Sequence, residues 1–279
     1  MLALVAVALL SAPAPNWELV VLGVAQDAGM PHLGCAKGVC LEVHEGKRMR
    51  EKVSCLGLVD RTSGDSYLFD ATPDMPEQLH ALNGGRAPTG VFLTHAHLGH
   101  YTGLMYFGRE SIGARKVPVY GTDRMQKFLA DNGPWSQLVM LGNIDLNALV
   151  PDRAVSLPGG LKVTPFSVPH RDEFTDTVGF RIEGPRQTVV FIPDIDQWER
   201  WARPIRAMAD GADLLFLDGT FGDPAEIGRN LAEIPHPMVP HTRDVLRGAK
   251  GKVWFIHFNH TNAERDANDA AKEGMRFEI

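Results

Sequence analysis

Short apolar runs separated by Gly, Pro and polar residues recur along the whole chain, and each has the length of a β-strand. They predict strands, most of them buried, at 17–24, 90–94, 117–120, 161–168, 213–217 and 253–258. Two further pairs of runs predict hairpins, namely 53–59 with 66–71 and 177–183 with 187–192.

Helices are predicted between these strands, where capping residues and helix-ending glycines appear. Pro73 opens a helix that ends at Gly84, and Thr122 is an N-cap residue for a helix that stops before Gly133. Further helices are expected at 101–107, 198–209 and 263–273.

The densest candidate chemistry lies in residues 90–103, GVFLTHAHLGHYTG. The predicted strand ends at Thr94, and His95, His97 and His100 follow within six residues. Imidazoles this close together at a strand exit can converge on one point, which suits a metal ion such as zinc, iron or manganese. A catalytic site of this kind needs about three protein ligands and an open position for water. The alternative is a His-rich solvated loop.

Later strands also end in residues that bind metals. His170 follows the strand at 161–168, and Asp194 and Asp196 both follow the strand at 187–192. His257 and His260 lie at or just past the end of the last apolar run. On the residues alone, either member of each pair is able to reach a site formed at the strand exits.

The stretch THAHLGH resembles the His-x-His-x-Asp-His motif of the metallo-β-lactamase superfamily, with Gly99 where that family has its Asp. Further stretches resemble the branch that contains pyrroloquinoline quinone biosynthesis protein B: VVLGVAQDAGMPHLGC, DTVGFRI, FIPDID, LDGT and FIHFNHTN. The resemblance covers nearly the whole chain. It implies an α/β fold, a four-layered αββα sandwich, with residues 15–279 as a single domain.

The resemblance also implies a set of metal ligands. One metal is expected on His95, His97 and His170, and a second on His100 and His257, with Asp194 bridging the two. Asp196 is the fallback for Asp194, and His260 competes with His257 for the last place. His236 and His260 are expected to contact substrate, His236 from a loop over the site, with His241 as a further candidate.

Gly99 removes one ligand of the second metal and the usual group that orients the attacking water. We hypothesise that Asp172 or Glu173, just past His170, supplies the missing carboxylate. Together with Asp194 these residues form the predicted catalytic set. If no carboxylate replaces the missing one, a mononuclear centre is expected.

These residues favour a metal-dependent hydrolase that acts on an ester, lactone, amide or phosphodiester of a small-molecule substrate. Zinc is the expected cofactor, as one or two ions, with iron or manganese as alternatives. Two other functions remain open: a metal-dependent oxidoreductase or oxygenase related to quinone cofactor biosynthesis, and a metal or small-molecule binding protein without catalysis.

The loop after the first strand, AQDAGMPHLGCAKGVC, is too long for a tight turn and is expected to line one end of the sheet. Gln26 and Asp27 lie just past the strand end, where their side chains are able to reach a site, or else they are ordinary loop residues. Cys35 and Cys40 have three open states: a disulfide, a zinc site completed by His32 or His44, or free thiols. Cys55 is expected in the core.

Composition and charge indicate which binding partners and which cellular compartment to expect. The net charge is −6 and no Lys/Arg run occurs, so nucleic-acid binding is not expected. Residues 1–14 combine an apolar run with an Ala-Pro-Ala ending and predict a signal peptide, although no Lys or Arg precedes the run. Export to the periplasm or outside is therefore expected, with the cytoplasm as the alternative. No run reaches membrane-spanning length, and the oligomeric state stays open.

Overall fold

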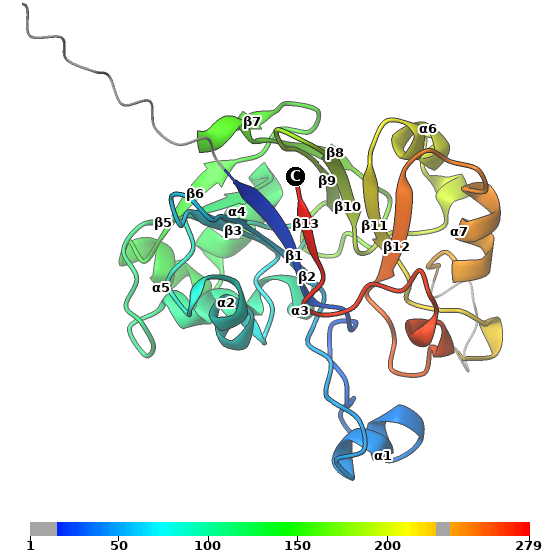
Figure 1. Ribbon diagram of the computed structural model, residues 1–279. Coiled ribbons are helices and arrows are strands. Elements are labelled where there is room, and N and C mark those ends of the chain that lie inside the picture. The colour runs from blue at the N-terminus through cyan, green and yellow to red at the C-terminus, as the bar shows by residue number, and fades with distance from the viewer. Residues whose placement is uncertain (1–15, 227–234) are drawn as a thin grey trace, which may run out of the picture.

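Two β-sheets lie face to face in the computed structural model, which describes residues 16–226 and 235–279 (Figure 1). Across the first sheet the order is β13 (Arg276–Glu278), β1 (Trp17–Gly23), β2 (Cys55–Asp60), β3 (Ser66–Phe69), β4 (Gly90–Phe92), β5 (Val117–Gly121) and β6 (Ile144–Ala148). Across the second it is β12 (Lys252–Ile256), β11 (Leu214–Asp218), β10 (Thr188–Ile192), β9 (Val178–Glu183), β8 (Lys162–Ser167) and β7 (Val155–Ser156).

Helices cover the outer face of each sheet (Figure 1). The first sheet carries α2 (Met75–Asn83), α3 (Leu98–Tyr101), the 3₁₀ helix η1 (Thr102–Phe107), α4 (Asp123–Asp131) and α5 (Trp135–Met140). The second carries η3 (Trp198–Arg200), α6 (Ile205–Asp210) and α7 (Val239–Val245). The connections contain α1 (Gly38–His44), which stands away from the sandwich, and the short turns η2 (Pro158–Gly160), η4 (Pro224–Glu226) and η6 (Ala263–Asp266). The expected αββα sandwich is confirmed.

Two of the predicted helices are longer than the helical segments in the structure. The segment 198–209 is broken into η3 and α6 because Pro204 lacks a backbone N–H and its ring excludes a helical residue before it. The predicted helix 263–273 is reduced to η6. Its second half instead pairs with β12, where Ala271 donates its N–H to the Phe255 carbonyl at 2.8 Å.

The core between the sheets is built on aromatic rings from both of them. Phe69 stacks on Phe92 within the first sheet at a centroid distance of 5.2 Å. Phe180 of β9 meets both rings edge-on, at 5.5 and 5.8 Å. All three side chains are fully buried, so this contact fixes how the sheets stack.

The directions of the strands determine at which edge of each sheet the loops after the strands lie. In the first sheet β1 and β4 run the same way, since β2 is antiparallel to both β1 and β3, and β3 is parallel to β4. In the second sheet β8, β10, β11 and β12 share one direction for the same kind of reason. The carboxyl ends of these strands therefore lie at one edge of each sheet.

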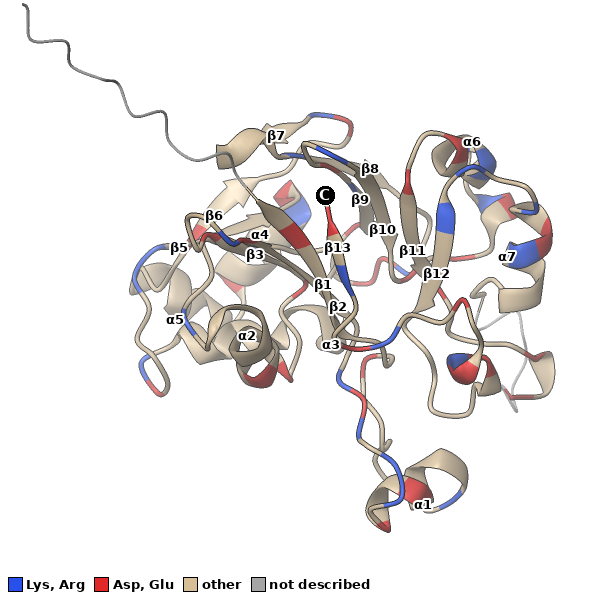
Figure 2. Cartoon of the chain, viewed as in Figure 1, with Lys and Arg blue, Asp and Glu red and all other residues tan. Residues whose placement is uncertain are grey.

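Charged residues lie mostly on the surface of the sandwich, and few lie in its interior. Figure 2 shows Lys and Arg interspersed with Asp and Glu along the helices and loops, while the strands carry few of either. No helix among the described residues is long and apolar enough to cross a membrane. The predicted signal peptide at 1–14 lies outside the described residues and stays a prediction.

We expect Phe180→Ala to lower the free energy of unfolding by about 3–5 kcal/mol, because it empties a fully buried site between the sheets. Denaturant unfolding of the purified protein measures this. Met140→Ala is the control, since that side chain is 78% exposed and its loss should cost no more than about 0.5 kcal/mol. Equal losses for the two variants would contradict the assignment of Phe180 to the core.

Candidate metal centre

The strand exits deliver titratable residues from both sheets to one place. Each of the strands that share a direction is followed within a few residues by one of these side chains: Asp27 after β1, His95 after β4, His170 after β8, Asp194 after β10, Asp218 at the end of β11 and His257 after β12. The local sequence sets only where each strand ends. The stacking of the sheets brings the six side chains together.

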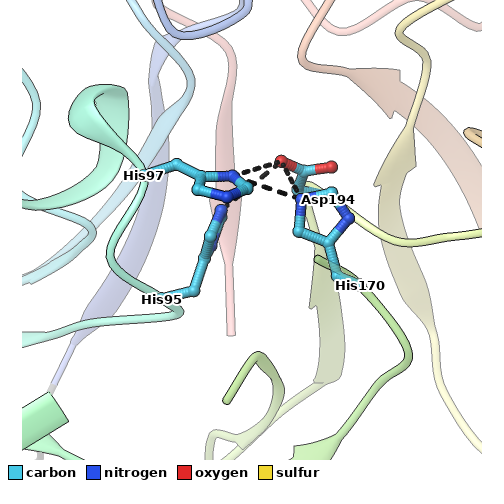
Figure 3. Close-up of side chains that lie close together, drawn as sticks. All are labelled: His95, His97, His170 and Asp194. Carbon is cyan, nitrogen blue, oxygen red and sulfur yellow. Dashed lines mark hydrogen bonds and ion pairs between the residues drawn. The ribbon is translucent and has the colours of Figure 1, made fainter. Parts of the chain in front are cut away.

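A first cluster consists of His95, His97, His170 and Asp194, whose ligand atoms all lie within 4.8 Å of one another (Figure 3). The nearest atoms to Asp194 Oδ2 are His170 Nε2 at 3.1 Å, His95 Nε2 at 3.5 Å and His97 Nδ1 at 3.9 Å. His95 and Asp194 are buried, at 1% and 3% exposure. The cluster has the composition and closeness of a divalent-metal site.

A second cluster consists of Asp27, His100, Asp194 and His257, again with all ligand atoms within 4.8 Å of one another. His100 Nε2 lies 3.2 Å from Asp27 Oδ1, and His257 Nε2 lies 4.0 Å from Asp194 Oδ2. Asp194 thus belongs to both clusters. His257 has φ of +68°, a conformation that a non-glycine residue seldom adopts and that here directs the chain after β12.

Several buried ligand atoms in these clusters make no hydrogen bond to any residue within 16–226 or 235–279. They are His95 Nε2, His100 Nε2, His257 Nε2, Asp27 Oδ1 and Asp194 Oδ1. Leaving one buried polar atom unpaired costs about 1–3 kcal/mol, so a group of them at one point is unusual unless another species binds there. Their lone pairs fit a divalent cation, and the donor set of imidazole and carboxylate suits it chemically.

The other nitrogen of each imidazole is held from outside the clusters. Thr94 Oγ1 lies 2.9 Å from His95 Nδ1, Asp70 Oδ2 lies 2.7 Å from His100 Nδ1, and Thr220 Oγ1 lies 3.0 Å from His257 Nδ1. Such partners fix the ring orientation and the tautomer, so that the remaining nitrogen faces the cluster.

Asp196 has this supporting role as well. Its Oδ1 lies 3.3 Å from His170 Nδ1, and its Oδ2 accepts a hydrogen bond from Arg200 at 2.9 Å. The fallback assignment of Asp196 as the shared carboxylate is therefore corrected: Asp194 occupies that position, and Asp196 orients His170 from behind.

The buried charged groups around Asp194 shift one another's pKa values. Burial raises the pKa of Asp194, but the charges of His170, His236 and His257 outweigh it and hold that pKa well below its usual range. Burial lowers the pKa of His170, but the charge of Asp194 outweighs it and raises that pKa to about 10. Burial and the charge of His100 together lower the pKa of His95. A proton on the His170 ring therefore offsets the negative charge of the buried Asp194 carboxylate.

Asp172 and Glu173 are not at the second cluster, which corrects their predicted role as replacements for the motif Asp. The Asp172 side chain is 72% exposed and lies 3.4 Å from Arg124. Glu173 Oε2 lies 3.2 Å from His97 Nε2, on the outer side of the first cluster, with the side chain 48% exposed. The carboxylate beside His100 comes instead from Asp27, for which the sequence offered only its place just past a strand.

His260 is also removed from the site. Its Nδ1 lies 3.4 Å from Cys40 Sγ, and together with Cys35 these residues form a separate cluster of ligand atoms within 4.8 Å of one another. The His32 ring stacks on His260 at 4.5 Å. The expectations that His260 contacts substrate or binds the last metal are therefore corrected.

The three cysteines are free thiols in the structure, so no disulfide joins Cys35 to Cys40. The cluster with His260 leaves a zinc site open as one of the predicted states, with His260 in the place expected for His32 or His44. Cys55 is fully buried, as expected of a core thiol.

Of the two loop histidines, only His236 reaches the centre. Its Nδ1 lies 2.8 Å from Asp218 Oδ2 and 3.3 Å from Asp194 Oδ1, and the residue is 8% exposed. His241 instead pairs with Glu199 at 2.7 Å on the surface. Asp218 was not singled out by the sequence, although its place at the end of a buried strand was the available signal.

Comparison with known proteins defines the class. A family model described as the beta-lactamase superfamily domain matches residues 66–258, more than half of the chain. The chain therefore belongs to the β-lactamase superfamily.

Curated relatives and solved structures agree with the branch expected from the sequence. The chain is 27% identical to coenzyme PQQ synthesis protein B of Methylobacterium radiotolerans over 277 residues, covering 88% of this chain and 90% of the relative. The crystal structure of Zn²⁺-bound PqqB from Methylobacterium extorquens matches with a TM-score of 0.79 and 21% identity, over 94% of this chain and 100% of that one.

Two further structures share the fold. A diphosphatase from the PhnP family matches with a TM-score of 0.68 and 22% identity, covering 95% of this chain and 97% of its own. The metallo-beta-lactamase fold protein YhfI from Bacillus subtilis matches with a TM-score of 0.65 and 18% identity, covering 94% and 99%.

We expect divalent-metal binding to weaken as the pH falls from 8 to 6. The pKa of His170 is raised to about 10, so its ring carries a proton in this range that a metal must displace, and each displaced proton costs about tenfold in affinity per pH unit. Chelator competition at several pH values measures the affinity, and calorimetry in buffers of different ionisation enthalpy counts the protons released. His241→Ala, which removes a surface histidine, should leave both unchanged. An affinity that does not vary with pH would contradict this.

Proposed function

We propose that this chain is a metal-dependent hydrolase that cleaves an ester, lactone, amide or phosphodiester bond of a small substrate. The observation that carries the proposal is the convergence of His95, His97 and His170 on the buried Asp194. Two atoms of this cluster, His95 Nε2 and Asp194 Oδ1, are buried without a hydrogen bond to the described residues. Zinc is the proposed metal because imidazole and carboxylate ligands suit it, and iron or manganese are the alternatives. The zinc-bound state of the structurally similar PqqB supports this choice.

When bound, a divalent metal supplies a water of lowered pKa, and it polarises the oxygen of the bond under attack. The chain contributes fixed geometry and a dry site. Thr94 and Asp196 hold two of the ligand rings, and Asp194 lies between the two clusters at 3% exposure. Because the site excludes most water, its electrostatic interactions are stronger than at the surface.

His236 is the proposed substrate contact and proton donor. Asp218 holds its Nδ1, and the ring lies beside Asp194 at the edge of the first cluster. Burial lowers the pKa of His236, but the charges of Asp218 and Asp194 outweigh it and raise that pKa above its usual value. A protonated imidazole in this place can donate a proton to a leaving group as its bond breaks.

A second candidate is a step in quinone cofactor synthesis, such as an oxygen-dependent oxidation. Its support is the name of the curated relatives, coenzyme PQQ synthesis protein B, at 27% identity over 88% of this chain. The metal distinguishes the two: bound iron with uptake of O₂ favours the oxidation, and bound zinc with hydrolysis favours the first proposal. Binding without turnover is the third outcome.

The decisive experiment combines elemental analysis with a substrate panel led by phosphodiesters, because a diphosphatase shares the fold. We expect His95→Ala and His170→Ala to lower metal content and to reduce kcat/KM by at least about 100-fold, since each removes a ligand. A chelator should abolish turnover and Zn²⁺ should restore it.

His241→Ala is the matched control, because that histidine is 45% exposed and pairs with Glu199 at the surface. It should keep wild-type metal content and turnover. Hydrolysis that persists in metal-free protein, or in His170→Ala at the wild-type rate, would overturn the proposed function.

A further inference from the structure

We propose that Asp27, from the loop after β1, replaces the carboxylate that the histidine motif lacks at Gly99 and completes a second metal site with His100, His257 and Asp194. The inference rests on the proposed function for the presence of a metal in the first cluster. It goes further by assigning a ligand from outside residues 66–258, the part of the chain that matches the superfamily model.

The space around Gly99 is the first observation. A Cβ built on Gly99 would lie 2.4 Å from Asp27 Oδ1, 2.5 Å from its Cα and 3.0 Å from its Cβ. Real Cβ atoms do not approach other atoms so closely, so a side chain at 99 and the present position of Asp27 exclude each other. The glycine is not needed for a left-handed backbone, since it lies within α3. Its role is to leave room for Asp27.

The unpaired atoms beside it are the second, independent observation. His100 and His257 are both 0% exposed, and the Nε2 atom of each lacks a hydrogen-bond partner in the described part of the chain. Asp27 Oδ1 is buried and makes no hydrogen bond there either, although it lies only 3.2 Å from His100 Nε2. Two buried imidazoles and a carboxylate therefore face one point.

The spacing suits a metal of the size of zinc. Zinc bonds to nitrogen and oxygen of about 2.0–2.2 Å place its ligand atoms roughly 3–4 Å apart. The ligand atoms of Asp27, His100, Asp194 and His257 lie within 4.8 Å of one another, so small side-chain rotations close the remaining gap. Because Asp194 also belongs to the first cluster, the two metals would share it, as in paired-metal hydrolytic sites.

The backbone holds Asp27 in this place. Gln26 donates its N–H to the Phe258 carbonyl at 2.9 Å, and Phe258 donates its N–H to the Val24 carbonyl at 2.8 Å. On the other side Ser54 donates its N–H to the Ala25 carbonyl at 2.8 Å. The residue before Asp27 is thus bonded to the residue after His257, which fixes the distance between two of the proposed ligands.

The test is metal stoichiometry, with Asp27→Asn as the first variant because it keeps the shape and removes the charge. All proteins in this test carry Cys35→Ser and Cys40→Ser, which remove the separate ligand cluster of Cys35, Cys40 and His260. In this background, and at a buffered concentration of free Zn²⁺, we expect two equivalents with Asp27 present and one with Asp27→Asn, with affinity for the second lowered by at least about 100-fold. Asp172→Asn, at an exposed carboxylate, is the matched control and should keep two.

Conservative and truncated variants separate a ligand role from a structural one. Asp27→Ala should lose the second equivalent, and Asp27→Glu should keep part of the affinity for it, because it keeps a carboxylate. Gly99→Asp should lower the melting temperature, since its Cβ collides with the side chain and the Cα of Asp27. Thermal unfolding of each metal-free variant shows whether the fold is kept.

Two results would overturn the inference: one equivalent in the cysteine-free protein that keeps Asp27, or two with unchanged affinity in Asp27→Asn. These outcomes are distinct from a failure of the proposed function. If Asp27→Asn loses the second equivalent and no variant hydrolyses any substrate, the proposed function is wrong and Asp27 is still a metal ligand. If the protein binds one metal and Asp27→Asn leaves its rate of hydrolysis unchanged, the proposed function stands and the assignment of Asp27 as a metal ligand is wrong.

Discussion

The structure depends on the pairing of one buried carboxylate, Asp194, with imidazoles from both sheets. Nitrogen atoms of His170, His236 and His95 lie 3.1, 3.3 and 3.5 Å from its oxygens, and those of His97 and His257 lie within 4.0 Å. An unpaired charge at 3% exposure would cost several kcal/mol, so these partners are required for the carboxylate to stay ionised. The same requirement ties the end of β4 to the ends of β8, β10 and β12.

The polar groups around this centre fall into two sets: atoms that face Asp194 and its neighbours, and groups behind them that orient the imidazole rings. The inner atoms carry unpaired lone pairs, and the outer ones hold the rings: Thr94, Asp70 and Thr220 bind the far nitrogens of His95, His100 and His257. Asp70 is itself fully buried and has φ of +73°, so the backbone is strained where it supports the site. Rigid support of this kind is what a metal centre needs to keep its geometry.

The segment from Asp27 to Cys40, which runs from the exit of β1 into α1, contributes to two polar clusters. At one end Asp27 faces His100, and at the other Cys40 faces His260, which follows His257 by a few residues. The exit of β12 therefore lies close to both ends of this segment. Arg265 reinforces the contact through its ion pair with Glu51, whose backbone bonds to Met30 in that segment.

The sequence by itself determined the strands, their exits and the residues placed there, because apolar runs and the residues that end them are local signals. His95, His97 and His170 were identified in this way. The choice of Asp194 over Asp196 and of His257 over His260 came from the family resemblance, and all five residues lie together in the structure. The tertiary structure alone decided that Asp27 lies beside Gly99 and His100, since that depends on which distant atom fills a space beside α3. It also decided that His260 belongs with Cys40 and that Asp196 supports His170, because neighbouring residues past one strand end point to opposite sides. Local pattern sets which residues reach the edge of a sheet, and only packing sets which atoms meet there.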